Sequence, residues 1–141
     1  KEVYQSVLHC LKEGSKLLKP GAVSAKYEKK MALLVEAELI KLGLLKQEEV
    51  KSQDPERPLY KKYFMHGTAH FIGLDVHDVG LYTRPFEPGM VLTCEPGIYI
   101  PEEGIGCRLE NDYLITETGN LNLTAAMPIE IDEIEAIMNG S

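Results

Sequence analysis

The chain has 141 residues, of which 44% are hydrophobic and 26% charged, and a formal net charge of −7 at pH 7. This length and composition are typical of one globular domain with a substantial apolar core. The acidic surplus argues against a nucleic-acid-binding surface, which needs a basic face. No apolar run is long enough to span a bilayer. We therefore expect neither a nucleic acid nor a membrane as a partner.

Two amphipathic helices are predicted in the first 45 residues. The first covers residues 2–18, with Val3, Val7, Leu11 and Leu18 on one face, and ends at Pro20-Gly21. The second covers residues 24–42, with Ser24 as N-cap and Gly43 as the stop. Its apolar face consists of Tyr27, Met31, Leu34, Val35, Leu39 and Leu42. The polar segment 46–58 contains two prolines and is predicted to be a loop.

After residue 60, short runs that favour β-structure alternate with Gly and Pro. They predict antiparallel strands at residues 63–65, 71–74, 90–94, 98–100 and 106–116. Residues 128–138 are predicted to form a short helix with Ile131, Ile134 and Met138 facing inward. Helices followed by strands indicate an α+β domain, in which the helices pack on one face of an antiparallel sheet.

The three cysteines, Cys10, Cys94 and Cys107, are odd in number and lack a Cys-x-x-Cys spacing. This pattern disfavours a disulfide framework and favours a reduced, cytoplasmic setting. Cys94 and Cys107 lie in apolar runs, where we expect them to act as small hydrophobic side chains rather than nucleophiles.

Three of the four histidines, His66, His70 and His77, fall within twelve residues. Such side chains can bind a metal through a neutral nitrogen or exchange a proton with a substrate. They can equally be buried, hydrogen-bonded histidines without any ligand. A fully extended strand would separate His66 from His70 by about 13 Å, so a close approach requires a bend at Gly67.

Two carboxylates are candidates for the same site. Glu95 ends the apolar run 90–94, where burial is costly unless the group is paired, protonated or bound to metal. Strand alternation places Arg108 and Glu110 on one face. The alternatives are a turn or capping role for Glu95 and a surface ion pair between Arg108 and Glu110. One histidine with two carboxylates is a reasonable donor set for a divalent ion.

Four sequence strings occur in a fixed order: FMHGTAHFIGLDVHDVG at 64–80, EPGMVLTCEPGIY at 87–99, GIGCRLE at 104–110 and ITETGN at 115–120. Together they resemble the motifs of the aminopeptidase P and prolidase family. The resemblance implies the pita-bread fold and two divalent metal ions, with manganese expected, held by two Asp, one His and two Glu.

The same resemblance assigns roles to individual residues. It implies that His70, Glu95 and Glu110 are metal ligands, and that His66, His77 and Arg108 are catalytic and substrate-binding. The two ligand aspartates would precede Lys1, and the chain does not begin with Met. We therefore expect residues 1–141 to be a partial catalytic domain, without its N-terminal strands and these aspartates, and inactive alone.

The implied activity of the parent protein is removal of the N-terminal residue from peptides with Pro in second position. The parent is expected to be a cytoplasmic homo-oligomer. A prolidase, which cleaves Xaa-Pro dipeptides, is the nearest alternative. A non-catalytic pita-bread binding module is an alternative of another class, and it is disfavoured because all six site residues are present.

Overall fold

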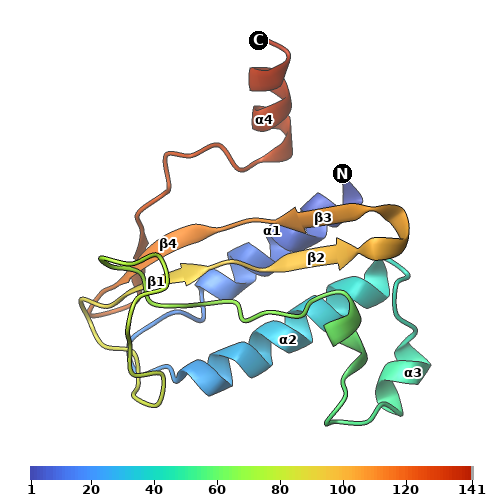
Figure 1. Ribbon diagram of the computed structural model, residues 1–141. Coiled ribbons are helices and arrows are strands. Elements are labelled where there is room, and N and C mark those ends of the chain that lie inside the picture. Colours follow the sequence, from blue (N-terminus) through green and yellow to red (C-terminus); the bar gives the residue numbers. More distant parts are fainter. Residues whose placement is uncertain (141) are drawn as a thin grey trace.

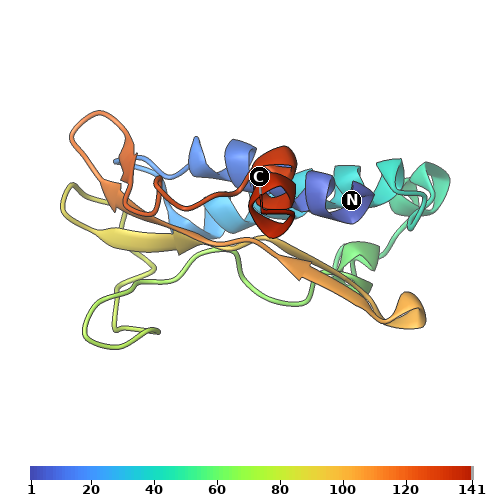
Figure 2. The same ribbon diagram turned by 90° about the horizontal axis from the view of Figure 1, so that it is seen from above.

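The computed structural model describes residues 1–140, and its elements form two layers (Figures 1 and 2). One layer consists of α1 (Glu2–Ser15) and α2 (Ser24–Lys41), and the other is an antiparallel ribbon. The ribbon contains β1 (Val91–Cys94), β2 (Gly97–Ile100), β3 (Ile105–Arg108), β4 (Asn111–Ile115) and β5 (Asn120–Asn122). The predicted α+β class, with helices on one face of antiparallel strands, is confirmed.

Both predicted N-terminal helices are present, each slightly shorter than expected. Positive φ angles at Gly21 (82°) and Gly43 (74°) let the chain turn after each helix. The prediction that Ser24 is the N-cap was wrong, because the cap is Val23 and makes no side-chain hydrogen bond. Ser24 is instead the first helical residue.

The strands form one long bent hairpin with an added fifth strand. β1 pairs with β4 from Val91↔Leu114 to Cys94↔Asn111, and β2 pairs with β3 from Gly97↔Arg108 to Ile100↔Ile105. A 3-10 turn, η2 (Pro101–Glu103), closes the hairpin, and β5 pairs with the outer edge of β4. The predicted strands at 90–94, 98–100 and 106–116 are thus present, although the last is divided into two.

Two other predicted strands were wrong. Residues 63–65 follow a short 3-10 helix, η1 (Leu59–Lys62), and lie outside any strand. Residues 71–74 form only an isolated bridge between Phe71 and Leu92. Beyond that bridge the side chain of Asp78 accepts a hydrogen bond from the Leu74 amide, and the Asp78 amide donates to the Phe71 carbonyl. These contacts draw the backbone into a loop.

The polar segment 46–58 also differs from its prediction, because it contains a short helix, α3 (Gln47–Lys51). Its two prolines lie after this helix, so they do not interrupt it. Glu48 and Glu49 occupy the first turn and Lys51 the last, an arrangement that complements the helix dipole.

The core lies between the helix layer and the ribbon. Its central fully buried side chains are Val7, Leu11, Met31, Val35, Leu39, Leu92 and Ile98. At this interface Gly14 lies so close to α2 that an added Cβ would be 2.6 Å from the Met31 sulfur. Cys10 and Cys94 are also buried, and burial raises the pKa of each thiol to about 12, as expected for hydrophobic rather than nucleophilic cysteines.

The C-terminal helix α4 (Ile131–Met138) stands away from the two layers (Figure 1). The Tyr4 hydroxyl on α1 donates a hydrogen bond to the Ile129 carbonyl at 2.8 Å and so holds the segment that leads into α4. The prediction that Met138 faces inward was wrong, since it is 80% exposed. Ile131 and Ile134 are half-buried. No helix within residues 1–140 has the length and apolarity that crossing a membrane requires.

Candidate metal centre

His70, Glu95 and Glu110 come together beside the middle of the ribbon. Each offers one potential ligand atom, and these atoms all lie within 4.8 Å of one another. The strand pairing explains why Glu95 and Glu110, fifteen positions apart in the sequence, lie close together. Glu95 follows β1 and Glu110 precedes β4, so both lie at the break between the Cys94↔Asn111 and Gly97↔Arg108 pairs. In residues 1–140 this group contains no aspartate.

The loop that carries the histidines runs along the free edge of β1. The Thr93 amide donates to the His70 carbonyl at 2.9 Å, and the His70 amide donates to the Thr93 hydroxyl at 3.1 Å. The Glu95 amide donates to the Thr68 carbonyl at 2.8 Å. These bonds hold the loop against the strand end and place His70 opposite Glu95.

The hydrogen bonding of His70 fixes which ring nitrogen faces the cluster. Its Nδ1 lies 2.8 Å from the Phe71 carbonyl oxygen, which can only accept, so Nδ1 carries the proton. Nε2 then faces Glu95 Oε1 at 3.4 Å, and both side chains are nearly buried. A bare nitrogen lone pair would repel the carboxylate. A proton on either group or a cation between them would remove this repulsion, and the donor set suits a divalent ion.

Glu110 adds a second negative charge to the group. Glu110 is exposed, but partial desolvation of its carboxyl raises its pKa, and the neighbouring charges of Glu95 and Asp112 raise it further, whereas His70 and Arg108 act in the opposite direction. Two carboxylates held this close favour the uptake of a proton or a cation.

Arg108 partly balances this charge, but its partner differs from the surface pair considered above. Its Nη1 lies 3.7 Å from Glu95 Oε2, and the Arg108 side chain is half-exposed. Within residues 1–140 its ion pair is with Glu95 rather than Glu110. Arg108 therefore contacts the cluster through Glu95, while part of its side chain is exposed to solvent.

His66 and His77 line the same open pocket of about 330 Å³ as the three candidate ligands. The ring of His77 is exposed and stacks on that of His70, with 4.1 Å between centroids. His66 Nδ1 lies 2.7 Å from the Gly67 carbonyl oxygen, and its Nε2 lies 2.9 Å from the Tyr99 hydroxyl. All six predicted site residues thus share one pocket, without the extended strand that would have separated His66 from His70.

Sequence reasoning missed three residues that shape this site. Tyr99 contacts His66 from β2, and Thr68 and Glu28 fix the loop between His66 and His70. Tyr99 alternates with buried Ile98 and Ile100, a pattern that places it on the opposite face of β2 and could have marked it. Glu28 carried no such signal, because α2 has two other glutamates, Glu36 and Glu38.

A His and Glu cluster beside an antiparallel ribbon, in a two-layer α+β fold, defines a domain with a candidate metal centre. The sequence profile of metallopeptidase family M24 matches residues 1–117. The chain belongs to this family.

Relatives and solved structures agree with this assignment. The chain is 45% identical over 152 residues to Xaa-Pro aminopeptidase of Escherichia coli strain K12, covering 98% of this chain and 34% of that protein. It is 40% identical to mitochondrial intermediate cleaving peptidase 55 of Arabidopsis thaliana, covering 98% and 28%. The chain thus spans about a third of the length of these relatives.

Among solved structures, a putative aminopeptidase P from Bacillus anthracis superposes with a TM-score of 0.86 and 39% identity, over 99% of this chain and 31% of that one. Zinc-substituted E. coli aminopeptidase P in complex with product superposes with a TM-score of 0.85 and 42% identity, over 99% and 34%. The predicted resemblance to aminopeptidase P and the pita-bread fold are confirmed.

Proposed function

We propose that this chain supplies part of the catalytic domain of a metallo-aminopeptidase that removes the N-terminal residue from peptides with Pro second. The observation that carries the proposal is the convergence of His70, Glu95 and Glu110 in a pocket that His66, His77 and Arg108 also line. The relatives named Xaa-Pro aminopeptidase support the substrate class.

In this proposal His70, Glu95 and Glu110 hold divalent ions, with manganese as the expected metal. The remaining ligands, two aspartates by resemblance, come from outside residues 1–140. Divalent ions bound there would supply an activated water near neutral pH and a polarised scissile carbonyl.

In the proposed hydrolysis, side chains of this chain position the substrate and transfer protons. His77 donates a hydrogen bond to the oxygen that gains negative charge, a contact whose loss typically costs about 2.7–4 kcal/mol of transition-state stabilisation. A carboxylate oxygen of Glu95 carries the proton to the leaving proline nitrogen. Arg108 holds Glu95 through its ion pair, and His66, fixed by Tyr99, contacts the substrate beyond the scissile bond.

The test compares a tripeptide that has Pro in second position with the corresponding Xaa-Pro dipeptide, using the full-length protein with Mn²⁺. Cleavage of the tripeptide before Pro is the expected result. Activity confined to the dipeptide would reassign the protein to the prolidases. Metal binding without cleavage of either peptide would favour the non-catalytic binding module.

The homo-oligomeric state and cytoplasmic location remain predictions, which gel filtration and cell fractionation would test.

A further inference from the structure

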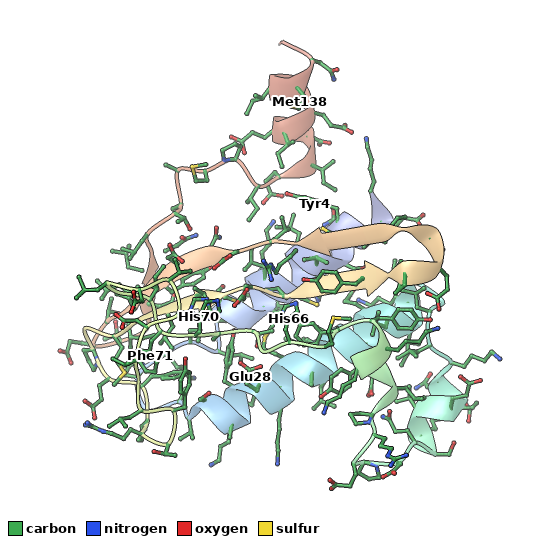
Figure 3. All side chains as sticks on the ribbon, viewed as in Figure 1. Tyr4, Glu28, His66, His70, Phe71 and Met138 are labelled. Atoms are coloured by element: carbon green, nitrogen blue, oxygen red, sulfur yellow. The ribbon has the colours of Figure 1, made fainter. Side chains whose placement is uncertain are left out.

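Glu28 lies on α2, below the labelled His66 and His70 in the view of Figure 3, and its carboxylate binds the loop between these two histidines. Its Oε1 accepts hydrogen bonds from the amides of Thr68 and Ala69, at 3.1 and 3.2 Å. Its Oε2 accepts from the Thr68 amide at 3.0 Å and from the Thr68 hydroxyl at 2.8 Å. The carboxylate of Glu28 therefore binds the loop between His66 and His70, forty residues away along the chain.

Thr68 passes this restraint on to the candidate ligands. Its side chain is fully buried, and its carbonyl accepts the amide of Glu95 at 2.8 Å. His70 follows two residues later and is itself bonded to Thr93 on β1. Hydrogen bonds thus connect Glu28 on α2 to Thr68, and Thr68 to the backbone of Glu95. The chain itself connects Thr68 to His70.

Glu28 is half-buried, so its carboxylate has lost part of its contact with water. The pKa of the Glu28 carboxyl is raised, because the effect of desolvation is larger than that of the hydrogen bonds from Thr68 and Ala69, which act in the opposite direction. A buried carboxylate is tolerated only where such donors replace water. Glu28 does not line the pocket that holds the candidate ligands; it lines a neighbouring open pocket of about 620 Å³, and His66 lines both.

We infer that Glu28 is a positioning residue, which orients His70 and Glu95 for metal binding by fixing Thr68 and Ala69. This inference rests on the proposed function, because it assigns the oriented side chains to a metal. Groups that orient metal ligands typically affect metal affinity or activity by about 10–100-fold when they are removed.

The experiment uses the full-length protein with Glu28→Ala, Glu28→Gln and a control, Glu36→Ala. Glu36 lies on the same helix and accepts a hydrogen bond from Gln53 rather than from the Thr68 and Ala69 amides. Glu28→Gln keeps one oxygen that can accept from the Thr68 and Ala69 amides, so it should restore part of what Glu28→Ala loses. Mn²⁺ affinity, kcat and KM, and the hydrogen exchange of the Thr68 and Ala69 amides are measured for each protein.

We expect Glu28→Ala to weaken Mn²⁺ binding by about 10–100-fold, lower kcat more than it raises KM, and speed exchange at both amides. Glu28→Gln should fall between it and the wild type, and Glu36→Ala should match the wild type. Unchanged Mn²⁺ affinity and exchange in either Glu28 variant would overturn the inference. So would an equal loss in Glu36→Ala, which would indicate only a general weakening of α2.

Failure of the proposed function gives a different result. If the wild type binds Mn²⁺ but cleaves no Xaa-Pro peptide, the proposed activity fails while affinity and exchange still decide the role of Glu28. If Glu28→Ala does not fold, the same two measurements on Glu28→Gln decide it. A wild type that binds no Mn²⁺ would overturn the metal assignment and this inference together.

Discussion

The ring of His77 stacks on the ring of His70, with 4.1 Å between centroids and 24° between planes, yet only His70 belongs to the cluster of candidate ligands. The two histidines therefore represent two kinds of site residue, a candidate metal ligand and a neighbour of that ligand. His70 has Nε2 aimed at Glu95, whereas His77 lies on the exposed side of the same pocket. Substitutions at the two kinds of position should therefore fail in different ways.

We predict that Glu95→Gln or Glu110→Gln in the full-length protein abolishes turnover and reduces bound metal. His77→Ala should lower turnover by about 100–1000-fold, because it removes the proposed hydrogen-bond donor to the oxygen that gains negative charge, and it should keep its metal, because His77 is not a ligand. Metal analysis alongside a tripeptide assay measures both properties. Metal loss in His77→Ala together with full metal content in Glu110→Gln would reverse the assigned roles.

The stability of the metal-free protein should depend on pH through Glu110. Its folded-state pKa is raised above the ordinary 4.5 by burial and by Glu95, so the folded state holds this proton more tightly than the unfolded state. The resulting stabilisation is complete below pH 4.5 and is lost as pH rises through the folded-state pKa.

We therefore expect Glu110→Gln, in the presence of a chelator, to have a higher Tm than the wild type at pH 7–8. The difference should shrink as the pH is lowered toward 4.5, because the wild-type carboxyl then becomes neutral as well. Thermal unfolding of both proteins across this range provides the comparison. A difference that does not change with pH would show that Glu110 does not titrate in this way.

The cysteines provide a test of the core. Cys10 and Cys94 are buried with pKa values raised to about 12, whereas Cys107 is only half-buried. At pH 8 a thiol reagent should modify Cys107 first and reach the other two only after denaturant is added. Mass spectrometry of the labelled peptides identifies the order. Early labelling of Cys10 or Cys94 in the native protein would contradict the packing of α1 and α2 on β1.

The sequence predicted the main helices, because α1 and α2 present regular apolar faces that end at glycines with positive φ. It also singled out Glu95, as an acid at the end of an apolar run, and Glu110, as an acid on the same strand face as Arg108. It could not give their separation, which depends on the register that sets Cys94 opposite Asn111. Residues 71–74 looked like a strand because Phe71 and Ile72 favour β-structure, but the hydrogen bonds of Asp78 override that local preference.

Glu28 shows a second limit of sequence reasoning. It follows Tyr27 on α2, and its spacing does not distinguish it from Glu36 or Glu38 on the same helix. Its role appears only when the folded chain brings the Thr68 and Ala69 amides to it. Contacts between a helix and a distant loop depend on tertiary packing, so the periodicity of either segment does not encode them.

The most direct test of a metal centre built partly from His70, Glu95 and Glu110 is calorimetric titration of Mn²⁺ into two proteins side by side. One is the full-length protein and the other is the 141-residue chain. We predict that two ions bind tightly to the full-length protein, whereas the 141-residue chain folds, holds no dinuclear centre and cleaves no Xaa-Pro tripeptide. Two tightly bound ions per 141-residue chain, or none in the full-length protein, would contradict this account.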